Sequence, residues 1–298
     1  MLRNPFVKLH VAIVLAGFTG IFGKLIQLQE GPLVWWRTLL TSALFGAYLC
    51  WKGRLPRLPF RDVSLLCGIG ALLAIHWLLF YGSIKCSNVS ITVVCFATIG
   101  FFTAIFEPLS KKKLPSLREL GFSMLTILGI ALIFHFDTQF RTGIILGVLC
   151  AVVGAVFTLC VRTVGDRFSS SAILLYEMIG GLVFLTLAAP VYLAVFPGIA
   201  LVPGGMDFLY LFLLSSVCGI GLFILQIQAL QEISAFTVNL SFNLEPIYSI
   251  ALAMALFGEA KELGVSFAVG LGLISFSVLL QTLYALRQTR VIRTRSGL

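Results

Sequence analysis

The chain has 298 residues, of which 59% are hydrophobic and only 11% are charged, and its mean hydropathy is +1.04. A soluble domain carries about 25% charged residues, and a soluble fold of this length could not hide so much apolar surface. The composition therefore excludes a soluble protein and predicts one that lies in a lipid bilayer. The net charge of +9 does not indicate a nucleic-acid partner, because the basic residues lie in short connections between apolar segments.

The apolar residues fall in blocks of about twenty, which is the length that a helix needs to cross a hydrocarbon core of about 30 Å. Helices are the expected spanning elements, because lipid offers no partner for an unpaired backbone group. In chain order the predicted spans are residues 8–26, 31–50, 63–82, 87–107, 119–136, 143–162, 171–196, 207–229, 234–257 and 263–285. We therefore expect an all-α integral membrane protein with ten transmembrane helices and no separate soluble domain.

The distribution of basic residues predicts the orientation in the membrane. Sixteen of the 21 lysines and arginines fall in the two termini and in the connections on one side, whereas four fall on the other side. Cytoplasmic connections are enriched in lysine and arginine. Both termini are therefore expected to be cytoplasmic.

Ten spans divide into five plus five, and an odd number in the first half forces the second half to enter the membrane in the opposite sense. Short motifs recur in the same order in both halves: Trp36-Arg37 and Tyr176-Glu177, Ser90-Ile-Thr-Val and Ala235-Phe-Thr-Val, and Glu119-Leu-Gly and Glu262-Leu-Gly. We therefore predict two inverted five-helix repeats, residues 1–137 and residues 138–298, the second of which ends in a basic cytoplasmic tail.

Glu245 is the most informative ionisable residue within a predicted span. A charged side chain in hydrocarbon costs about 3 kcal/mol on insertion scales, so such residues usually face a cavity or a partner. Glu245 lies near the middle of the ninth span, and Pro246 is expected to bend that helix by freeing the carbonyl of Phe242. Asn239 and Asn243 share a polar face of the same helix. The pattern predicts a site for a polar substrate or a coupling ion, and the alternative is a structural acid that bonds to a neighbouring helix.

Four further residues are candidates for the lining of a cavity or for its gates. Arg37 lies about two turns inside the outer boundary of its span, where it either snorkels to the interface, gates the outer mouth or holds an anionic substrate group. Glu177 would have the mirror role near the inner mouth, and both residues also fit simple pairing with other helices. His76 and Trp77 are expected to form an aromatic wall of a cavity or, alternatively, to pack between helices.

The remaining polar residues are expected to have ordinary roles. Glu107 is expected near the inner headgroups, where lysines 111–113 neutralise it, and Glu259 in an outer connection is expected to be solvated. Gln226 is expected to bond between helices rather than to bind substrate. The sequence holds no nucleotide-binding, metal-binding or hydrolase motif, so we expect no catalytic site, cofactor or metal.

Taken together, the five plus five spans, Trp36-Arg37, the stretch from Asn239 to Glu245-Pro246 and the Gly258-Glu259 pair resemble the EamA family of the drug/metabolite transporter superfamily. The resemblance covers roughly residues 8–285. It implies a bundle of ten helices around a central substrate cavity, with alternating access by rocking of the two repeats. The residues that it implies for the cavity lining are Glu245, Asn243, Asn239, Tyr248, His76 and Trp77.

We therefore expect a secondary transporter that exports small polar metabolites such as amino acids across the plasma membrane, which in bacteria is the inner membrane. The expected partners are the lipid bilayer and a small metabolite, and the oligomeric state stays open. Transport is either coupled to protons or facilitative, and Glu245 is the best candidate for a proton carrier, because burial disfavours the charged form of a carboxyl. The alternatives are a membrane-embedded enzyme acting on a lipid-linked substrate and a scaffold subunit without transport activity.

Overall fold

The computed structural model describes residues 4–136, 138–242, 244–259, 264–273, 275–277 and 279–280, and the regular secondary structure of these residues is helical. The helices are α1 (Pro5–Leu25), α2 (Glu30–Trp51), α3 (Phe60–Cys86), α4 (Val89–Phe96), α5 (Ile99–Ser110), α6 (Leu117–Phe136), α7 (Arg141–Val164), α8 (Ser170–Val195), α9 (Gly205–Leu213), α10 (Phe223–Glu232), α11 (Ala235–Phe242) and α12 (Glu245–Phe257). A 3-10 helix, Thr138–Phe140, precedes α7, and a π-helix, Leu214–Leu222, joins α9 to α10. Within the described residues, seven segments are long and apolar enough to cross a membrane, with α4–α5 and α9–α10 each counted as one segment. The protein is thus a multi-pass helical bundle, while the number of ten spans stays a prediction.

The first three predicted spans coincide with single helices, whereas spans four and nine are interrupted near their middles. In span four, α4 and α5 are separated by a turn at residues 97–98. In span nine, Pro246 was expected to bend a continuous helix, but α11 ends at Phe242 and α12 begins at Glu245. The span is therefore broken at this point rather than bent, because Pro246 lies in the first turn of a new helix, where its missing N–H removes no intrahelical hydrogen bond.

Close approach between α3 and α8 depends on glycine. A Cβ atom at Gly70 of α3 would overlap the backbone of Glu177 on α8, and one at Gly180 of α8 would overlap the backbone of Cys67 on α3. In lipid there is little hydrophobic driving force between helices, so small residues that let backbones touch are a main source of packing energy. These contacts fix α3, which carries several residues of the site, against the second half of the chain.

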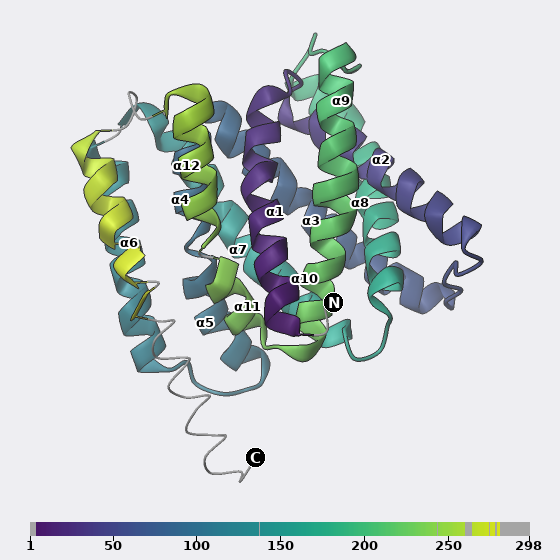
Figure 1. Ribbon diagram of the computed structural model, residues 1–298, viewed down its shortest axis with the longest axis horizontal. Coiled ribbons are helices and arrows are strands. Elements are labelled where there is room, and N and C mark those ends of the chain that lie inside the picture. Colours follow the sequence, from purple (N-terminus) through teal and green to yellow (C-terminus); the bar gives the residue numbers. More distant parts are fainter. Residues whose placement is uncertain are drawn as a thin grey trace.

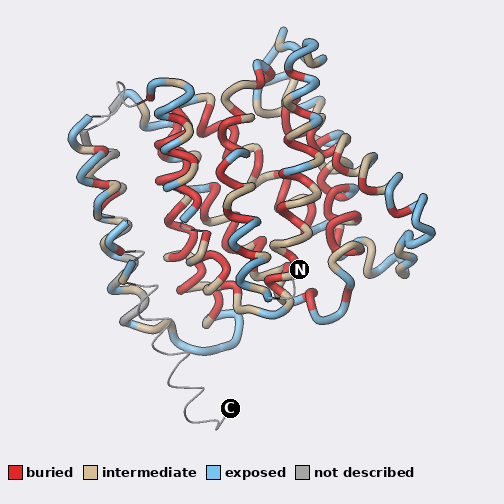
Figure 2. Tube along the Cα trace, in the orientation of Figure 1, coloured by how far each residue is buried: buried red, intermediate tan, exposed pale blue. Residues whose placement is uncertain are grey.

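The connections gather at two opposite ends of the bundle (Figure 1). At the end where α1 begins, here called the N-terminal face, Lys8 pairs with Glu232 at 3.1 Å. At the opposite face the backbone N–H of Gln27 donates to Asp207 at 3.0 Å. Buried residues concentrate on central helices such as α1 and α4, and exposed residues line the periphery (Figure 2). Leu187 and Val191 on α8 are 75% and 71% exposed, as expected for a surface that faces lipid.

Candidate functional site

A central cavity lies between the two halves of the chain, with walls from α1, α2, α3, α4, α5, α7, α10, α11 and α12. Its volume is about 60 Å³, counted as the space that the centre of a water-sized sphere can reach. Its walls are mostly apolar and aromatic with a few polar groups, which is typical of small-molecule sites. The polar side chains that line it are Thr19, Arg37, His76, Thr158, Gln226, Asn239 and Glu245.

Arg37 is buried in this cavity and is only partly satisfied by the protein. Its side chain is 1% exposed, so it does not snorkel to the interface. Nη1 donates a hydrogen bond of 2.5 Å to the Tyr81 hydroxyl, and the guanidinium carbon lies 3.8 Å from the centre of the Trp77 ring, which is a cation–π contact. Nε and Nη2 have no hydrogen-bond partner among the described residues. The guanidinium therefore keeps donors for an anionic group.

Glu245 lines the same cavity at the first residue of α12, beside the interruption of span nine. It is 3% exposed, and no hydrogen bond or ion pair to its carboxylate is found within the described residues. Arg37 and Glu245 therefore place a guanidinium and an ionisable carboxyl group in one cavity, and no contact between the two is found within the described residues. A buried charge without a partner is costly, so both groups favour a ligand that satisfies them.

His76 and Trp77 both line the cavity, as expected for an aromatic wall. The Nδ1 atom of His76 lies 3.1 Å from the carbonyl oxygen of Cys150, which ties the ring to α7. In the neutral tautomer that donates from Nδ1, the Nε2 atom is an acceptor. Trp77 packs edge-on against Phe223 of α10, with ring centres 5.3 Å apart, and thereby holds the platform on which Arg37 lies.

Asn239 joins three helices at the cavity wall. Its Nδ2 donates to Thr103 of α5 at 2.9 Å, and its Oδ1 accepts from Thr158 of α7 at 3.2 Å. These bonds make it a cross-link as well as a lining residue. Gln226 also lines the cavity, although the sequence favoured a bond between helices for it. The sequence did not mark Thr103, Thr158 and Gln226 as site residues, because neutral polar residues in spans are common interhelical partners.

Three predicted site residues lie elsewhere or cannot be placed. Tyr248 is not part of the cavity lining, and its hydroxyl lies 3.4 Å from Nε2 of His10 on α1. Glu177 is fully buried on α8 but does not line the cavity, and its carboxylate oxygens have no partner among the described residues. Asn243 lies outside the described residues. The described part of the chain contains no group of three metal-binding side chains that could hold an ion.

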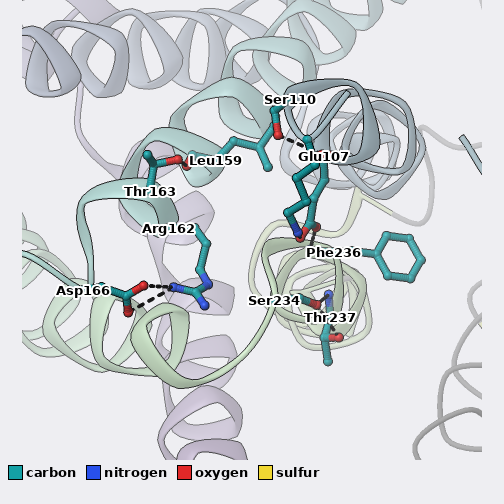
Figure 3. Close-up of polar contacts among 10 residues, drawn as sticks. Glu107, Ser110, Leu159, Arg162, Thr163, Asp166, Ser234, Phe236 and Thr237 are labelled. Atoms are coloured by element: carbon teal, nitrogen blue, oxygen red, sulfur yellow. Dashed lines mark hydrogen bonds and ion pairs between the residues drawn. The ribbon is translucent and has the colours of Figure 1, made fainter. Parts of the chain in front are cut away.

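Glu107 and Glu259 are both bound to the backbone of distant helices. Glu107 pairs with Lys111 at 2.8 Å, as expected, and its other oxygen accepts the backbone N–H of Phe236 at 2.8 Å (Figure 3). Glu259 was expected to be solvated, but it is 1% exposed and accepts the backbone N–H groups of Val89 and Ser90 at 3.1 and 3.0 Å. That expectation was wrong because the N–H groups in the first turn of a helix lack intrahelical acceptors. The carboxylate of Glu259 is the acceptor for two such groups at the start of α4.

The fold defines a multi-pass α-helical membrane protein with a cavity at its centre. Residues 7–135 and 141–283 each match the EamA-like transporter family, and the chain belongs to this family. The two matches confirm the family expected from the sequence and an architecture of two EamA repeats.

Two further comparisons are consistent with this assignment. The chain is 29% identical to an uncharacterized transporter of Haemophilus influenzae over 158 residues. This stretch covers 50% of this chain and 51% of that protein. The chain thus spans about half the length of the curated relative that it matches. A protein of known crystal structure with 16% sequence identity shares the fold, with a TM-score of 0.67 over 94% of this chain and 98% of the other.

Proposed function

We propose that this protein is a secondary transporter that exports small polar metabolites such as amino acids, by alternating access around the central cavity. The observation that carries the proposal is that Arg37, whose Nε and Nη2 atoms have no hydrogen-bond partner among the described residues, lines the same cavity as the carboxyl group of Glu245. An α-amino acid has a carboxylate and an ammonium group on one carbon. Such a ligand pairs with the guanidinium and with the ionised carboxyl group at once, which neither a sugar nor a nucleoside does.

In this proposal Arg37 binds the substrate carboxylate, because its Nε and Nη2 atoms keep their donors. Glu245 binds the ammonium group and carries the coupling proton when the site is empty. His76 and Gln226 offer polar contacts for the remainder of the substrate, and Trp77 bounds it. Asn239 is the lining residue that span nine contributes beside Glu245, Asn243 stays a candidate from the sequence alone, and we exclude Tyr248 from the set because its hydroxyl lies beside His10.

The proposed topology has ten transmembrane helices in two inverted repeats, residues 1–137 and 138–298. The charge pattern supports a cytoplasmic location for both termini, which makes the N-terminal face the inner one. The proposed location is the bacterial inner membrane. The odd number of spans in each half supports opposite orientation of the two repeats in the membrane.

A thermal-shift panel on the purified protein in detergent tests the substrate class. The panel covers amino acids, nucleosides, nucleotides and sugars at pH 6 and pH 8, because a ligand that binds the folded state raises its stability. Amino acids are expected to raise the unfolding temperature in a saturable way, and sugars and nucleosides are expected to leave it unchanged. A shift produced only by uncharged solutes, or by no member of the panel, would contradict the proposed substrate class.

A further inference from the structure

The two interrupted spans are capped by each other. Span four begins with α4 at Val89, and its first turn is held by Glu259, which follows α12 at the end of span nine. Span nine begins with α11, and the N–H of its second residue, Phe236, is held by Glu107 in the last turn of α5. Each span therefore contributes the carboxylate that caps the start of the other.

Both first turns have the same construction. A local side chain satisfies one N–H group in each: Asn88 accepts from the N–H of Ile91 at 2.9 Å, and Ser234 accepts from the N–H of Thr237 at 3.2 Å. The N–H groups nearer the helix start have no local acceptor, and the distant carboxylates accept from these. The acids therefore supply what the local sequence leaves missing, which distinguishes them from chance surface contacts.

The two caps lie at opposite ends of one seam. α4 packs on α12, and α5 packs on α11, so spans four and nine run side by side. The end of α5, which carries Glu107, lies at the N-terminal face, and the end of α12, which Glu259 follows, lies at the opposite face (Figure 1). Between them, Ile99 of span four and Asn239 of span nine line the cavity. Each end of this seam, between the cavity and one face, therefore carries one carboxylate contact.

We propose that Glu107 and Glu259 are the closing contacts of two gates, one at each face. Opening at the N-terminal face releases the N–H of Phe236 from Glu107, and opening at the opposite face releases the start of α4 from Glu259. Water that enters the opening mouth solvates the released carboxylate and N–H groups, so each contact is reversible. Rupture of one cap at a time leaves the cavity open to one side, which alternating access requires. The inference rests on the proposed transport cycle and adds the residues that close each side.

The two caps differ in strength. Glu259 accepts from two backbone N–H groups and, at 2.6 Å, from the hydroxyl of Ser90. Glu107 accepts from one backbone N–H, and its second oxygen is occupied by Lys111, whose side chain is 59% exposed. Loss of the Glu259 cap is therefore expected to shift the conformational equilibrium further than loss of the Glu107 cap.

Distances between spin labels on the full chain in detergent test the proposal without any substrate. One pair reports the opposite face, with labels on the native, exposed Cys86 and on a cysteine at Leu256. A second pair reports the N-terminal face, with cysteines at Lys113 and Ile233. The cysteines that are not used as label sites are replaced by serine or alanine.

Glu259→Gln is expected to raise the ratio of long to short distances in the Cys86 pair by about fivefold, the factor that corresponds to loss of one helix cap. It should leave the Lys113 pair unchanged. Glu107→Gln is expected to lengthen the Lys113 pair alone, by a smaller factor. Glutamine keeps the shape of the side chain and one acceptor oxygen, so both variants are expected to fold.

Two control variants separate the gates from general effects. Asp62→Asn breaks an ion pair with Arg167 that lies away from the seam, and it should move neither label pair. Lys111→Met removes the ion pair of Glu107 but not its cap, and should move the Lys113 pair less than Glu107→Gln does. Unchanged distances in both glutamine variants, or lengthening of the same pair in both, would overturn the proposal. Separate lengthening of the two pairs together with a negative thermal-shift panel would retain the gates and reject the amino-acid substrate.

Discussion

Arg37 is held in the cavity by a hydrogen bond to Tyr81 and by aromatic rings, of which that of Trp77 is the nearest, and these contacts leave Nε and Nη2 without a hydrogen-bond partner among the described residues. Tyr81 and Trp77 both come from α3, which is locked against α8, so the guanidinium is positioned before any ligand arrives. Preorganisation of this kind reduces the entropic cost of binding. The residue thus has the properties of a binding group rather than of a purely structural cation.

Replacement of Arg37 by glutamine is expected to weaken amino-acid binding at least about tenfold, because a hydrogen bond to a charged group contributes about 1.5–3 kcal/mol. The measurement is the ligand concentration that gives half of the maximal thermal shift. Arg162→Gln is the matched control, since Arg162 pairs with Asp166 at the N-terminal face and does not line the cavity. Equal affinities in the Arg37 variant and the wild type would remove Arg37 from the site.

At the scale of residues, the sequence identified groups whose position in a span is costly and missed groups whose role depends on a distant partner. The sequence identified Arg37 and Glu245 because an ionisable side chain in an apolar span is costly and usually faces a cavity or a partner. Glu259 was misread because its hydrogen-bond donors are 169 and 170 residues away in the chain, and nothing near it in sequence indicates them. Only the resemblance to the family placed Tyr248 in the cavity. Its hydroxyl lies beside Nε2 of His10 on α1 instead.

At the scale of elements, the interruptions of spans four and nine create the cavity wall. The break in span nine had a signal in Pro246, although its extent was underestimated. The break in span four at residues 97–98 contains neither glycine nor proline, and Thr98 bonds back to the carbonyl of Cys95 at 2.7 Å to support it. Such a break is set by packing with the facing span, so periodicity and composition of a single segment do not predict it.

The contact between α3 and α8 provides a prediction with a control only two residues away. Gly70→Ala is expected to destabilise the protein by about 1–3 kcal/mol, because its Cβ atom would overlap the backbone of Glu177, and backbone cannot move aside as a flexible side chain does. Gly68→Ala meets open space on the same helix and should be neutral or slightly stabilising, since alanine favours helix. Thermal unfolding in one detergent compares the two. Equal melting temperatures would mean that the two helices are not in contact.

At the scale of the whole molecule, composition alone was sufficient to assign the protein to the membrane, because no soluble fold accommodates 59% hydrophobic residues. The grouping of connections at two faces follows from span lengths, and ion pairs such as Lys8–Glu232 reinforce it. The arrangement of helices around a cavity came from resemblance, since ten apolar segments are compatible with many packings. Local physics therefore predicted the class, and the family supplied the expected architecture.

The charge asymmetry leads to a prediction about orientation. A fluorescent protein fused to the C-terminus is expected to be fluorescent in intact bacterial cells, and a phosphatase fused at the same point is expected to be inactive, because sixteen of the 21 basic residues favour the cytoplasmic side. A fusion in the connection between α8 and α9 should give the opposite pattern. An active phosphatase at the C-terminus would reverse the assignment of the inner and outer gates.

The central claim is that the cavity between Arg37 and Glu245 carries a small zwitterionic metabolite. The most direct measurement is transport of labelled amino acids into proteoliposomes, as exchange against unlabelled substrate and as accumulation driven by a proton gradient. The wild type is expected to perform both, and Glu245→Gln is expected to retain exchange but lose accumulation, because it cannot release a proton. Unchanged accumulation in the variant would contradict the role of Glu245, and absence of exchange by the folded wild type for every amino acid would contradict the claim itself.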